Sequence, residues 1–153
     1  MANQTVERIH PVPGSASRRV LVVEDEPLIA FDLISEIESG NHQVVGHCRT
    51  ADEAVIVAGR ERPDIVVMDI GLLGEGSGLE AARRIRDDYG IGCVFVSATL
   101  DRVDPDCWGD IDPVALIAKP YRDRALARAI GQSEIAPKPL GAGNRPEKIR
   151  KVI

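Results

Sequence analysis

Short apolar runs alternate with amphipathic stretches along most of this chain. Five of the runs are nearly continuous and rich in β-branched residues, and they cover residues 19–23, 43–47, 64–68, 93–97 and 114–118. Continuous apolar runs of this length are typical of parallel strands that are buried on both faces of a sheet. The pattern therefore predicts five strands.

The stretches between these runs carry the signals of helices. Pro27 suits the first position of a helix, and Gly40 provides a stop after an apolar face within residues 30–37. Two more helix starts are predicted by pairs with capping-box spacing, Thr50 with Glu53 and Ser77 with Glu80.

The last part of the chain completes the alternation. Asp104 followed by Pro105 predicts a short fourth helix, and the apolar positions Leu126, Ala129 and Ile130 predict a fifth. Strand and helix then alternate five times. Because crossovers between parallel strands are right-handed, this order predicts an α/β fold, a doubly wound five-stranded parallel sheet with helices on both faces.

The length and composition fit one folded domain. The chain has 153 residues, of which 44% are hydrophobic, and this suffices for one buried core. We assign the domain to residues 18–132. Residues 1–17 lack periodicity and residues 133–153 are rich in Pro and Gly, so both are expected to be flexible. The basic cluster at residues 148–151 is expected to be solvated.

Charge and cysteine content exclude several classes of protein. A net charge of -5 and an aromatic content of 3% disfavour nucleic-acid binding by the main body. The chain has neither a signal peptide nor an apolar run of about 18 residues, so we expect a cytoplasmic protein without a membrane span. Cys48, Cys93 and Cys107 are odd in number and form no CxxC pair, which favours buried thiols over disulfides or a zinc site.

Polar residues stand where the predicted strands end. Glu24 and Asp25 end the first strand, Asp69 the third and Ser97 the fourth, while Lys119 follows the fifth. Ligands of open parallel sheets bind outside the carboxyl ends of the strands. We therefore expect these five side chains to gather on one rim of the sheet.

Their chemistry suits a phosphoryl group. Clustered carboxylates repel one another and call for a cation, and a set of oxygen ligands without nearby His or Cys favours Mg²⁺ over Zn²⁺. A lysine and a hydroxyl group opposite the carboxylates would hold phosphoryl oxygens. A carboxylate nucleophile, a metal, a lysine and a hydroxyl group are together the components of aspartyl-phosphate chemistry.

Four motifs, in this order and spacing, resemble those of the response-regulator receiver domain of two-component signalling. They are "VLVVEDEP", "DIVVMDI", "VSAT" and "AKPY", and the resemblance covers about residues 18–132. It implies a flavodoxin-like or CheY-like (βα)5 fold with strand order 2-1-3-4-5. It also implies that Asp69 is the phosphoacceptor and that Ser97 and Lys119 hold the phosphoryl oxygens.

The resemblance further implies a Mg²⁺ site and a backbone feature. Asp25 and Asp69 would be direct metal ligands, the backbone carbonyl of Gly71 a third, and Glu24 a ligand through a bound water. The peptide bond between Lys119 and Pro120 is expected to be cis, as is usual in this family.

Two positions depart from the family pattern. Leu73 stands where a proline is usual after the phosphoacceptor, and Leu116 replaces the aromatic residue that commonly swings inward on activation. We therefore expect the loop after Ser97 and the helix that follows it to carry the change. The expected output surface includes Trp108, Tyr121 and Arg122.

The leading functional hypothesis is a regulatory phosphoacceptor, not a metabolic enzyme. A sensor histidine kinase or a histidine phosphotransfer protein would phosphorylate Asp69, and altered contacts with a downstream protein would carry the signal. The domain would act as a monomer or weak homodimer, either alone or as the receiver of a larger protein. Two alternatives are a phosphorylation-independent interaction module and a Mg²⁺-dependent phosphohydrolase that forms an aspartyl phosphate.

Overall fold

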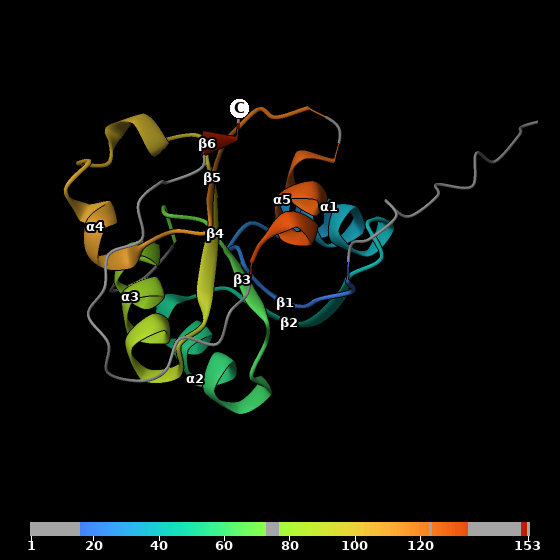
Figure 1. The fold of residues 1–153 in the computed structure, drawn as a ribbon, viewed down its shortest axis with the longest axis horizontal. Coiled ribbons are helices and arrows are strands. Elements are labelled where there is room, and N and C mark those ends of the chain that lie inside the picture. The colour runs from blue at the N-terminus through green and yellow to red at the C-terminus, as the bar shows by residue number, and fades with distance from the viewer. Residues whose placement is uncertain (1–15, 73–76, 123, 135–150, 153) are drawn as a thin grey trace, which may run out of the picture.

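The computed structural model describes residues 16–72, 77–122, 124–134 and 151–152 of the chain. They form a parallel sheet between two layers of helices (Figure 1). The order of the strands across the sheet is β2-β1-β3-β4-β5-β6. The bounds of the first five are β1 (Arg19–Val23), β2 (Gln43–Cys48), β3 (Ile65–Met68), β4 (Gly92–Ser97) and β5 (Ala115–Ala118). The predicted five strands and their order 2-1-3-4-5 are thus confirmed.

The strands alternate their side chains between two cores. Leu21, Val66 and Phe95 point to one face, where they meet α2 (Ala51–Glu61), α3 (Gly78–Tyr89) and α4 (Cys107–Ile111). The alternate residues of the same strands point to the opposite face, where they pack against α1 (Pro27–Ser39) and α5 (Ala125–Gln132). Burial on both faces explains why β1, β3, β4 and β5 are nearly continuous apolar runs, whereas β2 lies at the edge of the sheet and is partly exposed.

The first three helices begin where the sequence predicts, and the predicted short fourth helix, α4, begins at Cys107, two residues after Pro105. Pro27 occupies the first turn of α1. The Thr50 hydroxyl accepts a hydrogen bond from the Glu53 N–H at the start of α2, and Ser77 does the same for Glu80 at the start of α3. A short 3-10 helix, η1 (Leu100–Arg102), precedes α4. Among the described residues, no helix is long and apolar enough to cross a membrane.

A sixth strand, β6 (Lys151–Val152), pairs in parallel with β5 and was not among the predicted strands. Two residues are too few to show a periodicity, so the pattern of the sequence does not reveal it. β6 covers backbone groups that an edge strand leaves unpaired. The flexibility expected of both ends stays a prediction, because residues 1–15, 135–150 and 153, like Leu73, lie outside the described residues.

Trp108 and one cysteine differ from expectation. Trp108 is only 6% exposed and packs edge-on against Phe95, with ring centroids 5.2 Å apart. Its expected place on an output surface is therefore wrong, because α4 turns this side chain into the core. Cys48 and Cys93 are buried as predicted, but Cys107 is half-exposed because it begins α4 at the surface.

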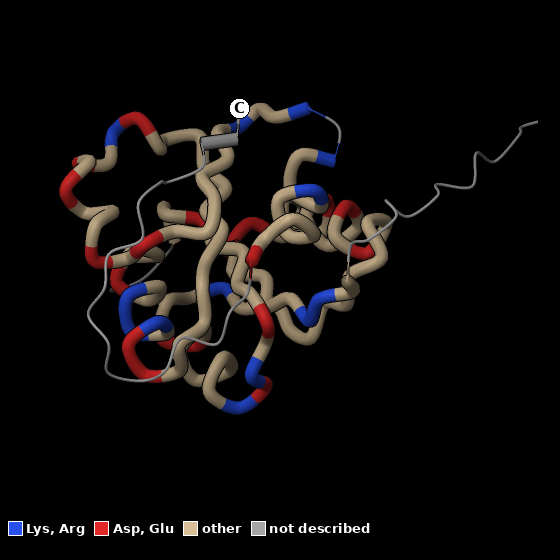
Figure 2. The backbone as a smooth tube through the Cα atoms, in the orientation of Figure 1, with Lys and Arg blue, Asp and Glu red and all other residues tan. Residues whose placement is uncertain are grey.

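The connection between β4 and β5 is acidic. It contains five aspartates and a single arginine, and in Figure 2 the acidic positions follow this path beside α4. The acidic residues lie on the loop and the outer turn, while Trp108 and Ile111 face the core. This side of the sheet thus carries much of the net negative charge.

Candidate functional site

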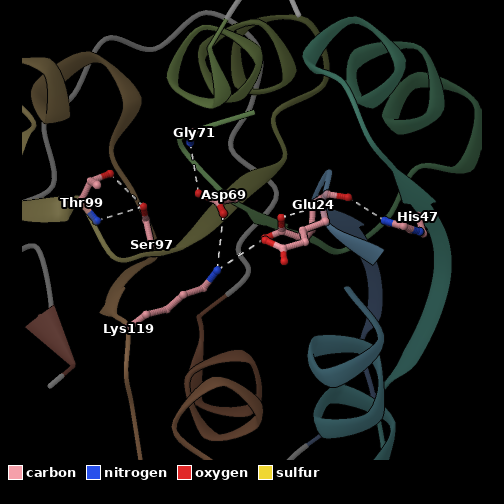
Figure 3. A network of polar contacts seen from close by, with 8 residues as sticks. Glu24, His47, Asp69, Gly71, Ser97, Thr99 and Lys119 are labelled. Carbon is pink, nitrogen blue, oxygen red and sulfur yellow. Dashed lines mark hydrogen bonds and ion pairs between the residues drawn. The ribbon is translucent and has the colours of Figure 1, made fainter. Parts of the chain in front are cut away.

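Four of the predicted site residues lie at the carboxyl ends of the strands (Figure 3). Glu24 follows β1, Asp69 follows β3, Ser97 ends β4 and Lys119 follows β5. The parallel order of the sheet places all of these ends on one rim. These four side chains therefore lie together at the rim, as the sequence predicts.

Lys119 connects the two carboxylates. Its Nζ lies 3.4 Å from Oδ2 of Asp69 and 3.5 Å from Oε2 of Glu24. The Lys119 backbone N–H donates to the carbonyl of Ser97, 3.1 Å away, which fixes the end of β5 against β4. The Lys119–Pro120 peptide bond is cis, as expected.

Glu24 is the most buried group of the site, with a side chain only 1% exposed. Burial, together with the neighbouring Asp69 carboxylate, raises the pKa of Glu24 to about 7, although the Glu26 N–H and the Lys119 ammonium favour ionisation. Burial also opposes ionisation of Asp69, but its pKa is lowered because hydrogen bonds with Glu24, the Gly71 N–H and Lys119 outweigh that cost. Below about pH 7, Glu24 therefore holds the proton of the pair, and Asp69 stays ionised.

The raised pKa of Glu24 and the lowered pKa of Asp69 predict how the stability of the metal-free protein varies with pH. The folded state binds a proton at Glu24 more tightly than the unfolded state, whose ordinary pKa is 4.5. Unfolding free energy should therefore fall as the pH rises from about 5 to about 8, by at most about 3 kcal/mol. Asp69 contributes in the opposite sense only at more acidic pH, below its ordinary value of 3.8.

Urea unfolding in the presence of a chelator measures this effect. Glu24→Gln should flatten the pH profile across that range, and Glu38→Gln is the matched control because Glu38 is an exposed carboxylate on the outer face of α1. A Glu24→Gln profile parallel to that of the wild type would place the linked proton elsewhere.

Ser97 and Asp25 are at the rim without contacting the ionic centre. The Ser97 hydroxyl is 3.1 Å from the hydroxyl of Thr99 and accepts from the Thr99 N–H. Asp25 is half-exposed and has no side-chain hydrogen bond or ion pair among the described residues. The Gly71 N–H donates to Oδ1 of Asp69 over 3.1 Å. The structure thus assembles Glu24, Asp69 and Lys119, with Ser97 turned toward its own loop.

Three neighbours of the site were not predicted from the sequence. Thr99 holds the Ser97 hydroxyl, and the His47 ring donates from Nε2 to the Glu24 carbonyl at 2.8 Å. A Cβ atom on Gly78 would lie 2.1 Å from the Asp69 carbonyl oxygen, so only glycine allows α3 to start this close to the site. The signal for Gly78 was a glycine directly after a capping serine, and Thr99 lies within the motif "VSAT", whereas His47 had no signal.

Comparison with known proteins agrees with this architecture. The response regulator receiver domain model matches residues 20–131. The phyllosphere-induced regulator PhyR of Methylorubrum extorquens is 35% identical over 116 residues, which are 74% of this chain and 42% of that protein. The transcriptional regulatory protein PdtaR of Mycobacterium tuberculosis is 32% identical over 117 residues, 76% of this chain and 57% of that protein.

Solved structures give the same result. The response regulator PhyR from Brucella abortus superposes with a TM-score of 0.67 at 34% identity, covering 78% of this chain and 48% of that one. The chain spans about half the length of the first curated relatives that it matches. Receiver domains are regulatory modules that interact with histidine kinases or phosphotransfer proteins and generally bind Mg²⁺ at an acidic phosphorylation site. From its fold, its rim residues and these matches, the chain belongs to the response regulator receiver domain family.

Proposed function

We propose that this domain accepts a phosphoryl group on Asp69 from a histidine kinase or a histidine phosphotransfer protein. The observation that carries the proposal is the placement of the Lys119 ammonium 3.4 Å from the Asp69 carboxylate, at the end of the central strand β3. Asp69 is 16% exposed, so an incoming donor can reach it, whereas the neighbouring Glu24 is buried. Asp69 is thus the ionised and accessible carboxylate of the pair.

The reaction is an in-line displacement at phosphorus. An Asp69 oxygen forms a bond to phosphorus while the phosphorus–nitrogen bond of the donor phosphohistidine breaks, and the electron pair returns to the imidazole, which takes up a proton. Lys119 stays protonated and pairs with a phosphoryl oxygen. The Ser97 hydroxyl turns from Thr99 to donate to another oxygen, because a charge-assisted hydrogen bond is stronger than a neutral one.

The acidic groups suit a magnesium ion. Glu24 and Asp69 face a single ammonium, and Asp25 adds further negative charge at the same rim. Among the described residues, no three His, Cys, Asp or Glu side chains form a ready-made metal cluster, so the Gly71 carbonyl and water have to complete the set. Asp25, Asp69 and Gly71 would hold Mg²⁺ directly, and Glu24 through water. When bound, the ion neutralises charge that would repel an anionic donor.

Two other functions are weaker. A phosphorylation-independent interaction module has no need for an ammonium held between two carboxylates, of which one is almost completely buried. A phosphohydrolase using Asp69 usually has a second acid-base carboxylate shortly after the nucleophile. Here Ile70, Gly71 and Leu72 occupy those positions.

Intact mass spectrometry distinguishes the three functions. With Mg²⁺ and acetyl phosphate, a receiver gains one phosphoryl group that hydroxylamine removes and that persists long enough to be isolated. A phosphorylation-independent module gains none. A phosphohydrolase instead releases phosphate over many turnovers without accumulating the adduct, and this result would replace the proposed function.

The output is proposed to leave through the loop after β4. Leu116 is buried within the core next to α4 and has no aromatic ring to move, so the usual rotation of an aromatic residue has no counterpart here. Displacement of the Ser97 and Thr99 hydroxyls would instead shift η1. Binding of a downstream protein would then respond to phosphorylation at this acidic side of the domain.

A further inference from the structure

The first turn of α5 is held by a side chain from α1. Oε1 of Glu36 accepts hydrogen bonds from the backbone N–H groups of Leu126 and Ala127, at 3.1 and 3.5 Å. These N–H groups belong to the start of a helix, where no carbonyl of the same helix can accept them. Glu36 thus acts as a helix cap supplied from a different element.

α5 has no cap of its own. Arg124, the residue before the helix, is in the left-handed conformation with φ 61° and makes no side-chain capping bond, and the first turn contains no acidic residue. A carboxylate at this position satisfies the free N–H groups and also interacts favourably with the positive end of the helix dipole. The local sequence of α5 does not provide this charge, so its first turn depends on α1.

Close packing keeps α1 and α5 in a fixed relation. A Cβ atom on Gly40, at the end of α1, would lie 2.6 Å from the Cβ of Ala127, so glycine permits the contact. The His42 ring donates from Nε2 to the Ala127 carbonyl at 3.2 Å. Ala127 is therefore held through its N–H by Glu36 and through its carbonyl by His42.

The same carboxylate lies beside Tyr121, which is two residues after Lys119. Tyr121 is half-buried and packs against the core that α1 and α5 cover. Burial raises the pKa of the Tyr121 hydroxyl, and the Glu36 and Asp32 carboxylates raise it further. The Glu36 carboxylate thus lies beside Tyr121, just after Lys119, and also binds the first turn of α5.

We propose that Glu36 is a positioning residue for Lys119, because it anchors the turn between β5 and α5 from which the lysine extends toward Asp69. On the β4 side, Lys119 is fixed by its bond to the Ser97 carbonyl. On the α5 side, the Glu36 carboxylate holds the first turn of the helix, and the His42 ring adds a bond to the Ala127 carbonyl. The role in phosphorylation rests on the proposed function of Asp69, whereas the placement of Lys119 in the resting protein does not.

The test compares Glu36→Ala, Glu36→Gln and the control Glu38→Gln in the full chain. Glu36→Ala should accelerate amide exchange at Leu126 and Ala127 by about tenfold, the typical consequence of losing a helix cap. It should also shift the amide and side-chain NMR resonances of Lys119 in the resting protein and slow phosphorylation by acetyl phosphate. Glu36→Gln keeps an oxygen acceptor and should restore most of each property, and Glu38→Gln should match the wild type.

The outcomes separate a positioning role from a capping role. Faster exchange in α5 with unchanged Lys119 resonances would overturn the inference, because Glu36 would then stabilise only the helix. Wild-type protein that takes up no phosphoryl group would instead refute the proposed function. The resonances of Lys119 in the resting protein would still decide whether Glu36 positions it.

Discussion

Asp69→Asn should reduce the hydroxylamine-labile phosphoryl adduct to background in the presence of Mg²⁺ and acetyl phosphate. The substitution keeps the shape of the side chain and an oxygen that can accept from the Gly71 N–H, so the loop after β3 should keep its conformation. It removes the ionised oxygen that attacks phosphorus. Phosphorylation should therefore be lost while the fold is retained. Intact mass spectrometry measures the phosphorylation, and circular dichroism measures the fold.

The neighbouring carboxylates make this a stringent test. Glu24 is buried and therefore shielded from a phosphodonor, whereas Asp25 is half-exposed and is the neighbouring carboxylate that a donor could reach instead. Asp88→Asn, on the exposed face of α3, is the matched control and should be phosphorylated as fast as the wild type. If Asp69→Asn still gained the phosphoryl mass at the wild-type rate, the acceptor would be another residue, and reduction of the adduct followed by peptide mapping would identify it.

Lys119→Ala should slow phosphorylation by about a hundredfold, the usual cost of removing one charged donor from a site where charge develops. Its effect on stability should depend on pH. Below about pH 6, Glu24 is largely protonated and only Asp69 loses its cation, so the loss of stability should be small. At about pH 8, Glu24 and Asp69 would face each other without their cation, and the variant should be less stable by about 2 kcal/mol.

Thermal unfolding at both pH values measures the change in stability, and a quenched time course of phosphorylation measures the change in rate. Arg122→Ala is the matched control, since it removes an exposed cation from the same turn and should change neither property. Equal phosphorylation rates in Lys119→Ala and wild type would show that a different group stabilises the phosphoryl oxygens. A stability loss of the same size at both pH values would mean that Lys119 does not act through the charge on Glu24, because its pairing with the ionised Asp69 is the same at both.

Much of the fold followed from local sequence signals. The five predicted strands lie within about one residue of those in the sheet, because parallel strands that are buried on both faces are apolar along most of their length. Thr50 and Ser77 were recognisable as caps because each helix start needs an acceptor for its free N–H groups. The strand order came from the resemblance to a known family, since neither periodicity nor capping determines which strands are neighbours.

For the site, the sequence predicted the positions of the residues but not their contacts. The positions of Glu24, Asp69, Ser97 and Lys119 at strand ends were visible in the sequence, because residues that end parallel strands share one rim. Which of them make contact was not visible. The structure joins Lys119 to both carboxylates and turns Ser97 toward Thr99, and this depends on side-chain conformations and on burial.

The sequence alone determined the alternation of strands and helices, the helix starts and the rim of functional groups, because each of these is recorded in residues close together in the chain. Only the tertiary structure decided that Glu24 is buried deeply enough to hold a proton, that Trp108 faces the core, and that Glu36 caps a helix ninety residues away in the chain. The physical reason is that desolvation and capping by a distant side chain depend on which elements pack together.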